Sequence, residues 1–197
     1  MANSVIERNG PQPQQYFSHP LIKYDSIEFR SYQSNIFASV KNKNALVILP
    51  TALGKIVIAI LVCAEFLYNY KSKRVLIMAP TKPLVSQHTT SFLSVLKMPE
   101  DRIVLLTGKN SPQARIAIWN QKEIRLVFAT PEVVKNDLAE NRLSLDEFSL
   151  LVFDEAHRAV KDYAYTSIAR YYVQQSSILT SCNSSHDSKP WIRARQN

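Results

Sequence analysis

The sequence predicts an α/β protein with a doubly wound, mainly parallel sheet, and two features of its 197 residues carry this prediction. Short apolar runs rich in β-branched residues recur along the chain, and segments with helical periodicity separate them. Polar turn residues follow most of these runs, as expected where strands end at the ligand-binding edge of a parallel sheet. Strands that alternate with helices at this spacing join through right-handed crossovers.

Five apolar runs are predicted to be strands, and a sixth run is a weaker candidate. The five cover residues 45–49, 74–79, 103–107, 124–129 and 148–153, and the sixth covers residues 177–180. The first run, ALVIL, contains no polar residue. We therefore expect this strand to be buried on both faces, as strands of parallel sheets are.

Helices are predicted between these strands, over residues 31–41, 55–70, 111–121 and 162–174 and in two further segments. One of the two contains Phe92, Val95 and Leu96, whose spacing places them on one helix face. The other begins at Thr130-Pro131, because threonine before proline is typical of a helix start.

The composition indicates a polyanionic partner. The chain carries 24 Lys+Arg and 16 Asp+Glu, a formal charge of +8, which suits nucleic acid better than a membrane surface. Two cysteines do not make a disulfide framework, and the polar N-terminus lacks a signal-peptide pattern. Pro50 and Lys55 interrupt the apolar stretch 45–67, so it is too short to span a membrane. We expect a soluble, intracellular (cytoplasmic) protein.

The segment PTALGK, which follows the first predicted strand, has the features of a phosphate-binding loop. In such a loop the turn amides and the helix N-terminus face an anion, and the lysine reaches the β- and γ-phosphates. The candidates for nucleotide binding are therefore Thr51, Ala52, Leu53, Gly54, Lys55 and Ile56. The alternative is an ordinary strand–turn–helix with one exposed lysine.

A second motif, Asp154-Glu155-Ala156-His157, follows the last of the five strands. Phosphoryl transfer needs a phosphate cradle, a divalent cation and a group that orients the attacking water. Asp154 is the candidate Mg²⁺ ligand, Glu155 the candidate for orienting water, and His157 a candidate for coupling the site to its surroundings. The alternative is an acidic helix N-terminus stabilised by the helix dipole. The presence of Gly54-Lys55 in the same predicted sheet favours the nucleotide site.

The motifs resemble, in order and spacing, those of the first RecA-like domain of superfamily 2 helicases of the DEAH type. They are Arg30-x-Tyr32-Gln33, PTALGKI, APTKPLVSQH, LLTGK, ATPE and FDEAHRAV. The longer segments HPLIKYDSIEFRSYQ and VFDEAHRAVKDYAY narrow the resemblance to archaeal Hef and the related Fanconi anaemia M helicases. We expect one domain over residues 19–181 after a mobile lead-in at 1–18.

The resemblance implies a P-loop NTPase domain that binds ATP and Mg²⁺ and contacts branched or single-stranded DNA in DNA repair. It implies that Arg30 and Gln33 lie near the adenine, that Lys55 and Asp154 are catalytic with Glu155 and His157, and that Asp154 handles Mg²⁺. The residues expected to line the nucleic-acid backbone are Pro80, Thr81, Lys82, Thr107, Gly108, Thr130 and Pro131. For this last set, plain turn chemistry is the alternative. An archaeal protein of this kind would be associated with the nucleoid.

Three departures from the family pattern affect function. Ile56 replaces the hydroxyl residue that binds Mg²⁺, and an aliphatic group cannot ligate a cation that needs oxygen. Ala52 replaces a glycine, at a cost of about 1 kcal/mol if that position needs a positive φ. After Ser181 the family continues into a second RecA-like domain, whereas here a polar tail follows, 182–197, in which we expect neither helix nor strand.

Two functional interpretations remain open. The first is the ATP-binding, DNA-contacting N-terminal domain of a Hef-like helicase or translocase acting on branched or forked DNA. It would be either a truncated relic or one piece of a split system in which a separate chain carries the second domain. The second is a non-catalytic protein that binds nucleic acid or a partner with the same fold, which Ile56 favours. Both predict little ATP hydrolysis by this chain alone, because no second-domain arginine is present.

Overall fold

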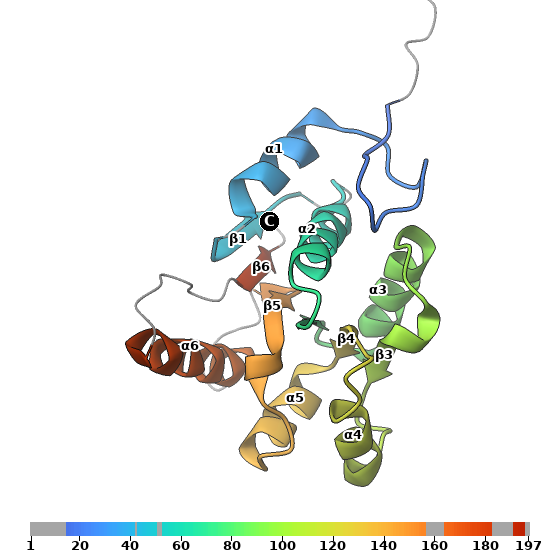
Figure 1. Cartoon of the computed structure of the whole chain (residues 1–197). Helices are drawn as coiled ribbons and strands as arrows, with labels where there is room; N and C mark the ends of the chain where they lie inside the picture. Colours follow the sequence, from blue (N-terminus) through green and yellow to red (C-terminus); the bar gives the residue numbers. More distant parts are fainter. Residues whose placement is uncertain (1–14, 42, 51–52, 157–163, 183–190, 196–197) are drawn as a thin grey trace, which may run out of the picture.

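A six-stranded parallel sheet lies between two layers of helices in the computed structural model, which describes residues 15–41, 43–50, 53–156, 164–182 and 191–195 (Figure 1). The strands are β1 (Ala45–Ile48), β2 (Arg74–Met78), β3 (Ile103–Leu106), β4 (Leu126–Ala129), β5 (Phe148–Phe153) and β6 (Trp191–Arg195). Their order is β1-β6-β5-β2-β4-β3, and all neighbouring strands are parallel. The doubly wound parallel fold is confirmed.

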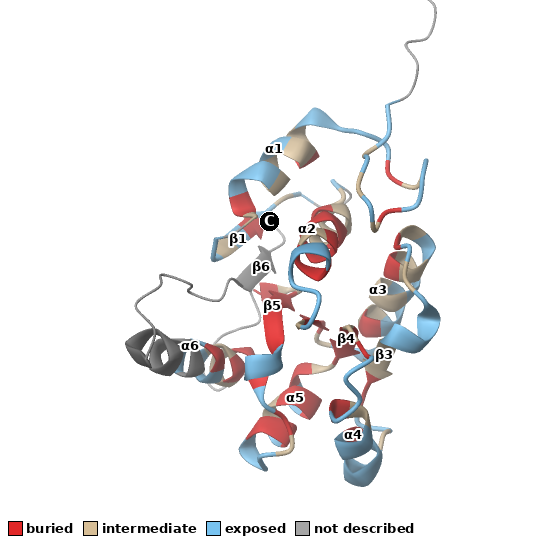
Figure 2. Ribbon diagram, viewed as in Figure 1, coloured by how far each residue is buried: buried red, intermediate tan, exposed pale blue. Residues whose placement is uncertain are grey.

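The helices divide between the two faces of the sheet (Figure 1). One face carries α1 (Ser31–Val40), α2 (Lys55–Asn69) and α3 (Lys82–Val95), and the other carries α4 (Pro112–Trp119), α5 (Pro131–Ala139) and α6 (Ala164–Cys182). Short 3₁₀ helices, Glu100–Arg102 and Leu145–Glu147, precede β3 and β5. Each face has its own apolar core, and the central strands β2, β4 and β5 are buried along their whole length (Figure 2). None of the described helices combines the length and apolarity that a membrane span requires.

β1 is an edge strand, and the prediction that it is buried on both faces was wrong. Among the described strands it pairs with β6 alone. Val47 faces the core of α1 and α2, whereas Leu46 and Ile48 are 48% and 43% exposed. The apolar run alone could not distinguish a central strand from an edge strand, because a local sequence pattern does not determine the order of strands in the sheet.

Two predictions near the C-terminus were also wrong. Residues 177–180 continue α6 instead of forming a strand, and Trp191–Arg195 form β6 in the predicted irregular tail. A short apolar run such as Ile178-Leu179 fits a helix or a strand equally well by periodicity. The alternation of apolar and charged residues in Ile192-Arg-Ala-Arg195 was the available strand signal. In the sheet, β6 lies between β1 and β5 and pairs with both strands.

The ordered fold begins before residue 19, so the predicted lead-in extends too far. The Phe17 amide donates a hydrogen bond to the Ile27 carbonyl at 2.9 Å, and the Phe29 amide donates to the Gln15 carbonyl at 2.7 Å. Residues 15–17 therefore pair with residues 27–29. Residues 1–14 lie outside the described residues.

Candidate nucleotide and nucleic-acid site

The carboxyl ends of the parallel strands bring the predicted motifs to one edge of the sheet. Gly54-Lys55 follows β1, Asp154-Glu155 follows β5, and Pro80 to Lys82 follow β2. Thr107-Gly108 and Thr130-Pro131 follow β3 and β4 in the same way. Ligands of open α/β sheets bind at this edge. Three predicted site residues, Thr51, Ala52 and His157, lie outside the described residues.

The loop before α2 contains one glycine whose backbone requires glycine. Gly54 caps α2 in the left-handed conformation, with φ +71°. A Cβ on Gly54 would lie 2.5 Å from Nε2 of the buried Gln33, so α1 packs directly against the loop. The Tyr32 hydroxyl also donates a hydrogen bond to the Leu53 carbonyl at 3.1 Å. α1 thus holds the described part of the loop through two consecutive side chains.

Gly54→Ala is expected to lower the free energy of unfolding by about 1–2 kcal/mol, because the left-handed backbone disfavours a Cβ and Gln33 must move. Gly108→Ala is the matched control, since a Cβ there meets nothing within 4 Å and φ is not positive. Urea denaturation of both variants measures the difference. Equal stability of the two variants would contradict this account of the loop.

Arg30, Gln33, Gly54 and Ile56 line a pocket of about 350 Å³ beside this loop. The Arg30 side chain is exposed and lies 3.3 Å from the Glu28 carboxylate. The predicted adenine residues and part of the predicted phosphate loop therefore share one pocket.

The Lys55 ammonium has the properties of an anion-binding group. Its Nζ atom is buried and has no hydrogen-bond partner among the described residues. A buried, unsatisfied charge is costly. Lys55 is also the first residue of α2, whose first turn contains no acidic residue, and the dipole of a helix favours an anion at this end. These residues fit the phosphates of a nucleotide.

Asp154 is held by three elements at the end of β5. Its amide donates to the Met78 carbonyl of β2 at 2.8 Å, and the Tyr165 hydroxyl of α6 lies 2.8 Å from the Asp154 carbonyl. Its carboxylate Oδ2 lies 2.7 Å from Nε2 of His88 on α3. His88 was not among the predicted site residues. The available signal was its place in APTKPLVSQH, on the helix that follows the strand next to β5.

The described residues supply little for a magnesium ion. Asp154 offers carboxylate oxygens, but Ile56 offers none, and no group of three or more His, Cys, Asp or Glu that could hold a metal occurs in the part of the chain that the structure describes. Mg²⁺ commonly takes one or two carboxylates together with nucleotide phosphates and waters. The residues that the structure describes therefore do not complete a magnesium site by themselves.

Glu155 has a left-handed backbone, with φ 54°. This conformation costs a non-glycine residue about 1–2 kcal/mol, and such strain concentrates at functional sites. Its side chain is half-buried beside Asp154. The left-handed backbone of Glu155 is consistent with the functional position that was predicted directly after β5.

The predicted nucleic-acid residues fall into two groups. Thr81, Lys82 and Gly108 are exposed, and Pro80 and Thr130 are half-buried. Thr107 and Pro131 are buried, so their side chains support the turns and do not offer a contact surface. A pocket of about 410 Å³ lies between the two turns, and it is lined by Gly108, Lys109, Asn110, Thr130 and Asn136, among others. The structure therefore brings the Gly108 and Thr130 turns together.

The strand order, with Gly54-Lys55 after β1 and Asp154-Glu155 after β5, is that of a RecA-like domain. Residues 26–180 match the family model described as "Type III restriction enzyme, res subunit". The chain belongs to this family, and its homologues are superfamily 2 helicases of the Hef and Fanconi anaemia M type.

Similar proteins include a putative ATP-dependent RNA helicase of Methanocaldococcus jannaschii, 43% identical over 164 residues, which are 83% of this chain and 21% of that protein. The DEAD-box ATP-dependent DNA helicase Fancm of Drosophila melanogaster is 40% identical over 155 residues, covering 77% of this chain and 10% of that protein. The crystal structure of the Pyrococcus furiosus Hef helicase domain aligns with a TM-score of 0.77 and 41% identity, covering 89% of this chain and 34% of that chain. This chain thus spans about a fifth or less of the curated relatives named here.

Proposed function

We propose that this chain is the ATP-binding, DNA-contacting first domain of a Hef-like helicase or translocase that acts on branched or forked DNA. The observation that carries the proposal is the buried Lys55 ammonium without a described partner at the N-terminus of α2. A nucleotide phosphate would supply the missing partner. The +8 charge supports a nucleic-acid partner, and a separate chain that carries a second helicase domain is a further candidate partner. Action on DNA would place the protein in the cytoplasm, at the nucleoid of an archaeal cell.

In this proposal Lys55 and the N-terminus of α2 hold the phosphates, and Gln33 and Arg30 lie beside the base. A bound Mg²⁺ would neutralise charge on the β- and γ-phosphates. Asp154, positioned by His88, would contact the hydration shell of that ion, and Glu155 would orient water. Because Ile56 contributes no oxygen, we expect weak binding of ATP or ADP that depends little on Mg²⁺.

Lys55→Met is expected to weaken ADP binding about tenfold to a hundredfold, the effect of losing a charged hydrogen bond. The same variant should be as stable as the unmodified chain or more stable, because it removes a buried ammonium with no described partner. Calorimetric titration and thermal unfolding measure the two effects. Lys71→Met, an exposed lysine before β2, is the matched control. Unchanged ADP affinity in Lys55→Met would refute the proposed phosphate site.

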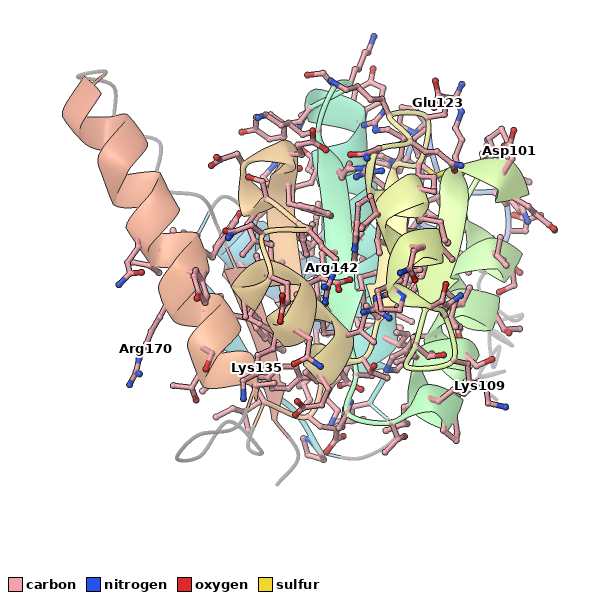
Figure 3. The ribbon with its side chains drawn as sticks, turned by 90° about the horizontal axis from the view of Figure 1, so that it is seen from below. Asp101, Lys109, Glu123, Lys135, Arg142 and Arg170 are labelled. Atoms are coloured by element: carbon pink, nitrogen blue, oxygen red, sulfur yellow. The ribbon has the colours of Figure 1, made fainter. Side chains whose placement is uncertain are left out.

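DNA binding is proposed for the carboxyl edge, where Lys82 and Lys109 are exposed. Figure 3 shows Lys109 and Lys135 toward one end of the molecule, and the acidic Asp101 and Glu123 toward the opposite end. The exposed lysines at this edge support an electrostatic contact with the nucleic-acid backbone.

Binding of single-stranded DNA should weaken about 20-fold between 50 and 200 mM salt if three lysines neutralise three phosphates, and it should not depend on sequence. Fluorescence anisotropy with oligonucleotides of two unrelated sequences measures both properties. An affinity that barely changes with salt would contradict the electrostatic contact.

A second candidate function is a binding domain without turnover, which recognises nucleic acid or a partner with the helicase fold. Ile56 favours this second function. An isoleucine at this position offers no oxygen to Mg²⁺, whereas Lys55 and the carboxyl edge proposed to bind DNA are retained. Mg²⁺-independent ADP binding together with salt-dependent DNA binding would agree with this reading.

A further inference from the structure

Asp137 on α5 is fully buried, and three side chains from two other segments converge on its carboxylate. Arg115 on α4 binds it with two hydrogen bonds of 2.8 Å, from Nε to Oδ2 and from Nη2 to Oδ1. Trp119 on the same helix donates from Nε1 to Oδ2 at 2.8 Å, and Arg142 donates from Nε to Oδ1 at 2.8 Å. We call these four residues the Asp137 cluster.

Arg115 makes one contact that the other arginine of the cluster does not make in the described structure. Its Nη1 donates to the Asn110 carbonyl at 2.6 Å. Asn110 closes the turn after β3, because its amide donates to the Thr107 carbonyl at 3.0 Å and its Oδ1 accepts from the Thr107 amide at 2.9 Å. Among the described residues, the Arg142 side chain contacts Asp137 and, at 3.9 Å, Glu140. Arg115 therefore connects the buried carboxylate to the 107–110 turn.

Stability alone does not account for the cluster. Replacing a buried ion pair with apolar residues of similar volume is often neutral or stabilising. What an arginine–carboxylate fork supplies is fixed geometry, because two parallel hydrogen bonds set the position and plane of the guanidinium. Here the fork fixes α4 relative to α5, and α5 begins at the Thr130-Pro131 turn. The turns at the ends of β3 and β4 are thus held on opposite sides of the pocket of about 410 Å³.

We propose that Arg115 is a positioning residue for nucleic-acid binding. Asp137 holds the Arg115 guanidinium, which fixes the 107–110 turn so that Gly108, Lys109 and Thr130 present one preformed surface to a phosphodiester backbone. A preformed surface binds more tightly because fewer groups lose freedom on binding. The inference rests on the proposed DNA contact at this edge.

The test compares Arg115→Lys with Arg142→Lys. Each variant keeps its charge and weakens one link to Asp137, but only Arg115→Lys also loses the contact to Asn110. Arg115→Lys should weaken binding of a single-stranded oligonucleotide about three- to tenfold at 50 mM salt. Arg142→Lys should lower the melting temperature and change the affinity less than about twofold. Asn110→Ala should weaken binding like Arg115→Lys, and it disrupts the turn without opening the buried cluster.

Each other outcome overturns the inference. If Arg115→Lys and Asn110→Ala bind DNA like the unmodified chain, the turn does not need positioning. If both arginine variants lose DNA affinity in proportion to the decrease in their melting temperatures, the cluster contributes to stability alone. Should Arg115→Lys fail to fold, Asn110→Ala and Arg142→Lys decide the question by the same criteria. If the unmodified chain shows no salt-dependent binding, the proposed DNA contact itself fails, and this inference fails with it.

Discussion

A polypeptide of these 197 residues is expected to hydrolyse ATP at a rate close to background, with or without DNA. Two features act on the charge that develops at the γ-phosphate. Ile56 offers no oxygen to Mg²⁺, and a polypeptide limited to these residues forms one RecA-like domain, so a transition-state arginine from a second domain would have to be added. Such an arginine is worth about 10³–10⁵ in rate in other NTPases. Phosphate release in the presence and absence of single-stranded and forked DNA measures the rate.

Repairing the phosphate loop separates the two features. Ile56→Thr combined with Ala52→Gly should strengthen binding of Mg²⁺-nucleotide and leave turnover near background, because the opposing arginine is still missing. Adding a separately expressed second helicase domain to this variant should then raise turnover. DNA-stimulated hydrolysis by the unmodified chain alone, abolished by Glu155→Gln, would contradict the prediction.

Asp137→Asn is expected to lower the free energy of unfolding by about 3–5 kcal/mol, because it leaves the buried Arg115 and the partly buried Arg142 without their shared counter-charge. This is a large part of the 5–15 kcal/mol that holds an ordinary domain together. Urea denaturation measures the change. Asp101→Asn, an exposed carboxylate before β3, is the matched control and should change stability by less than about 0.5 kcal/mol. A similar small change in Asp137→Asn would show that the cluster contributes little.

The same carboxylate predicts a pH dependence. Burial acts to raise the pKa of Asp137, but hydrogen bonds from Arg115, Trp119 and Arg142 outweigh it and hold the pKa below its ordinary value. A carboxyl whose folded-state pKa is lowered stabilises the fold above its unfolded pKa, near 3.9, and loses this contribution as pH falls through the folded value. The stability difference between the unmodified chain and Asp137→Asn should therefore be full at pH 7 and shrink below about pH 4.

The sequence predicted the elements whose patterns are long or sharply bounded. β5 was predicted with its observed limits, because five apolar residues and one serine stand between Glu147 and Asp154. β4 begins two residues later than predicted, at Leu126, although the backbone of Arg125 already bonds Val75 and Arg102. The exposure of β1 and the presence of β6 were not predicted. Both depend on the order of strands in the sheet, which no local sequence pattern determines.

The prediction of the candidate site had the same limit: local patterns located its motifs, and contacts made by packing were not predicted. Motifs that end strands were placed at one edge, because parallel strands share their carboxyl edge. His88 and Arg115 were not found, because their partners, Asp154 and Asp137, lie 66 and 22 residues away and only the packing of α3 on the sheet and of α4 on α5 brings them together. The buried state of Thr107 was likewise a matter of packing, not of turn chemistry.

Titration of ADP into the unmodified chain, once with excess Mg²⁺ and once with EDTA, tests the central claim most directly. The claim is that Lys55 and the start of α2 form a phosphate site in which Ile56 leaves Mg²⁺ without a protein hydroxyl. We expect weak binding whose affinity differs less than about threefold between the two conditions, and a larger Mg²⁺ effect in Ile56→Thr. Tight binding by the unmodified chain that requires Mg²⁺, or no ADP binding under either condition, would contradict the claim.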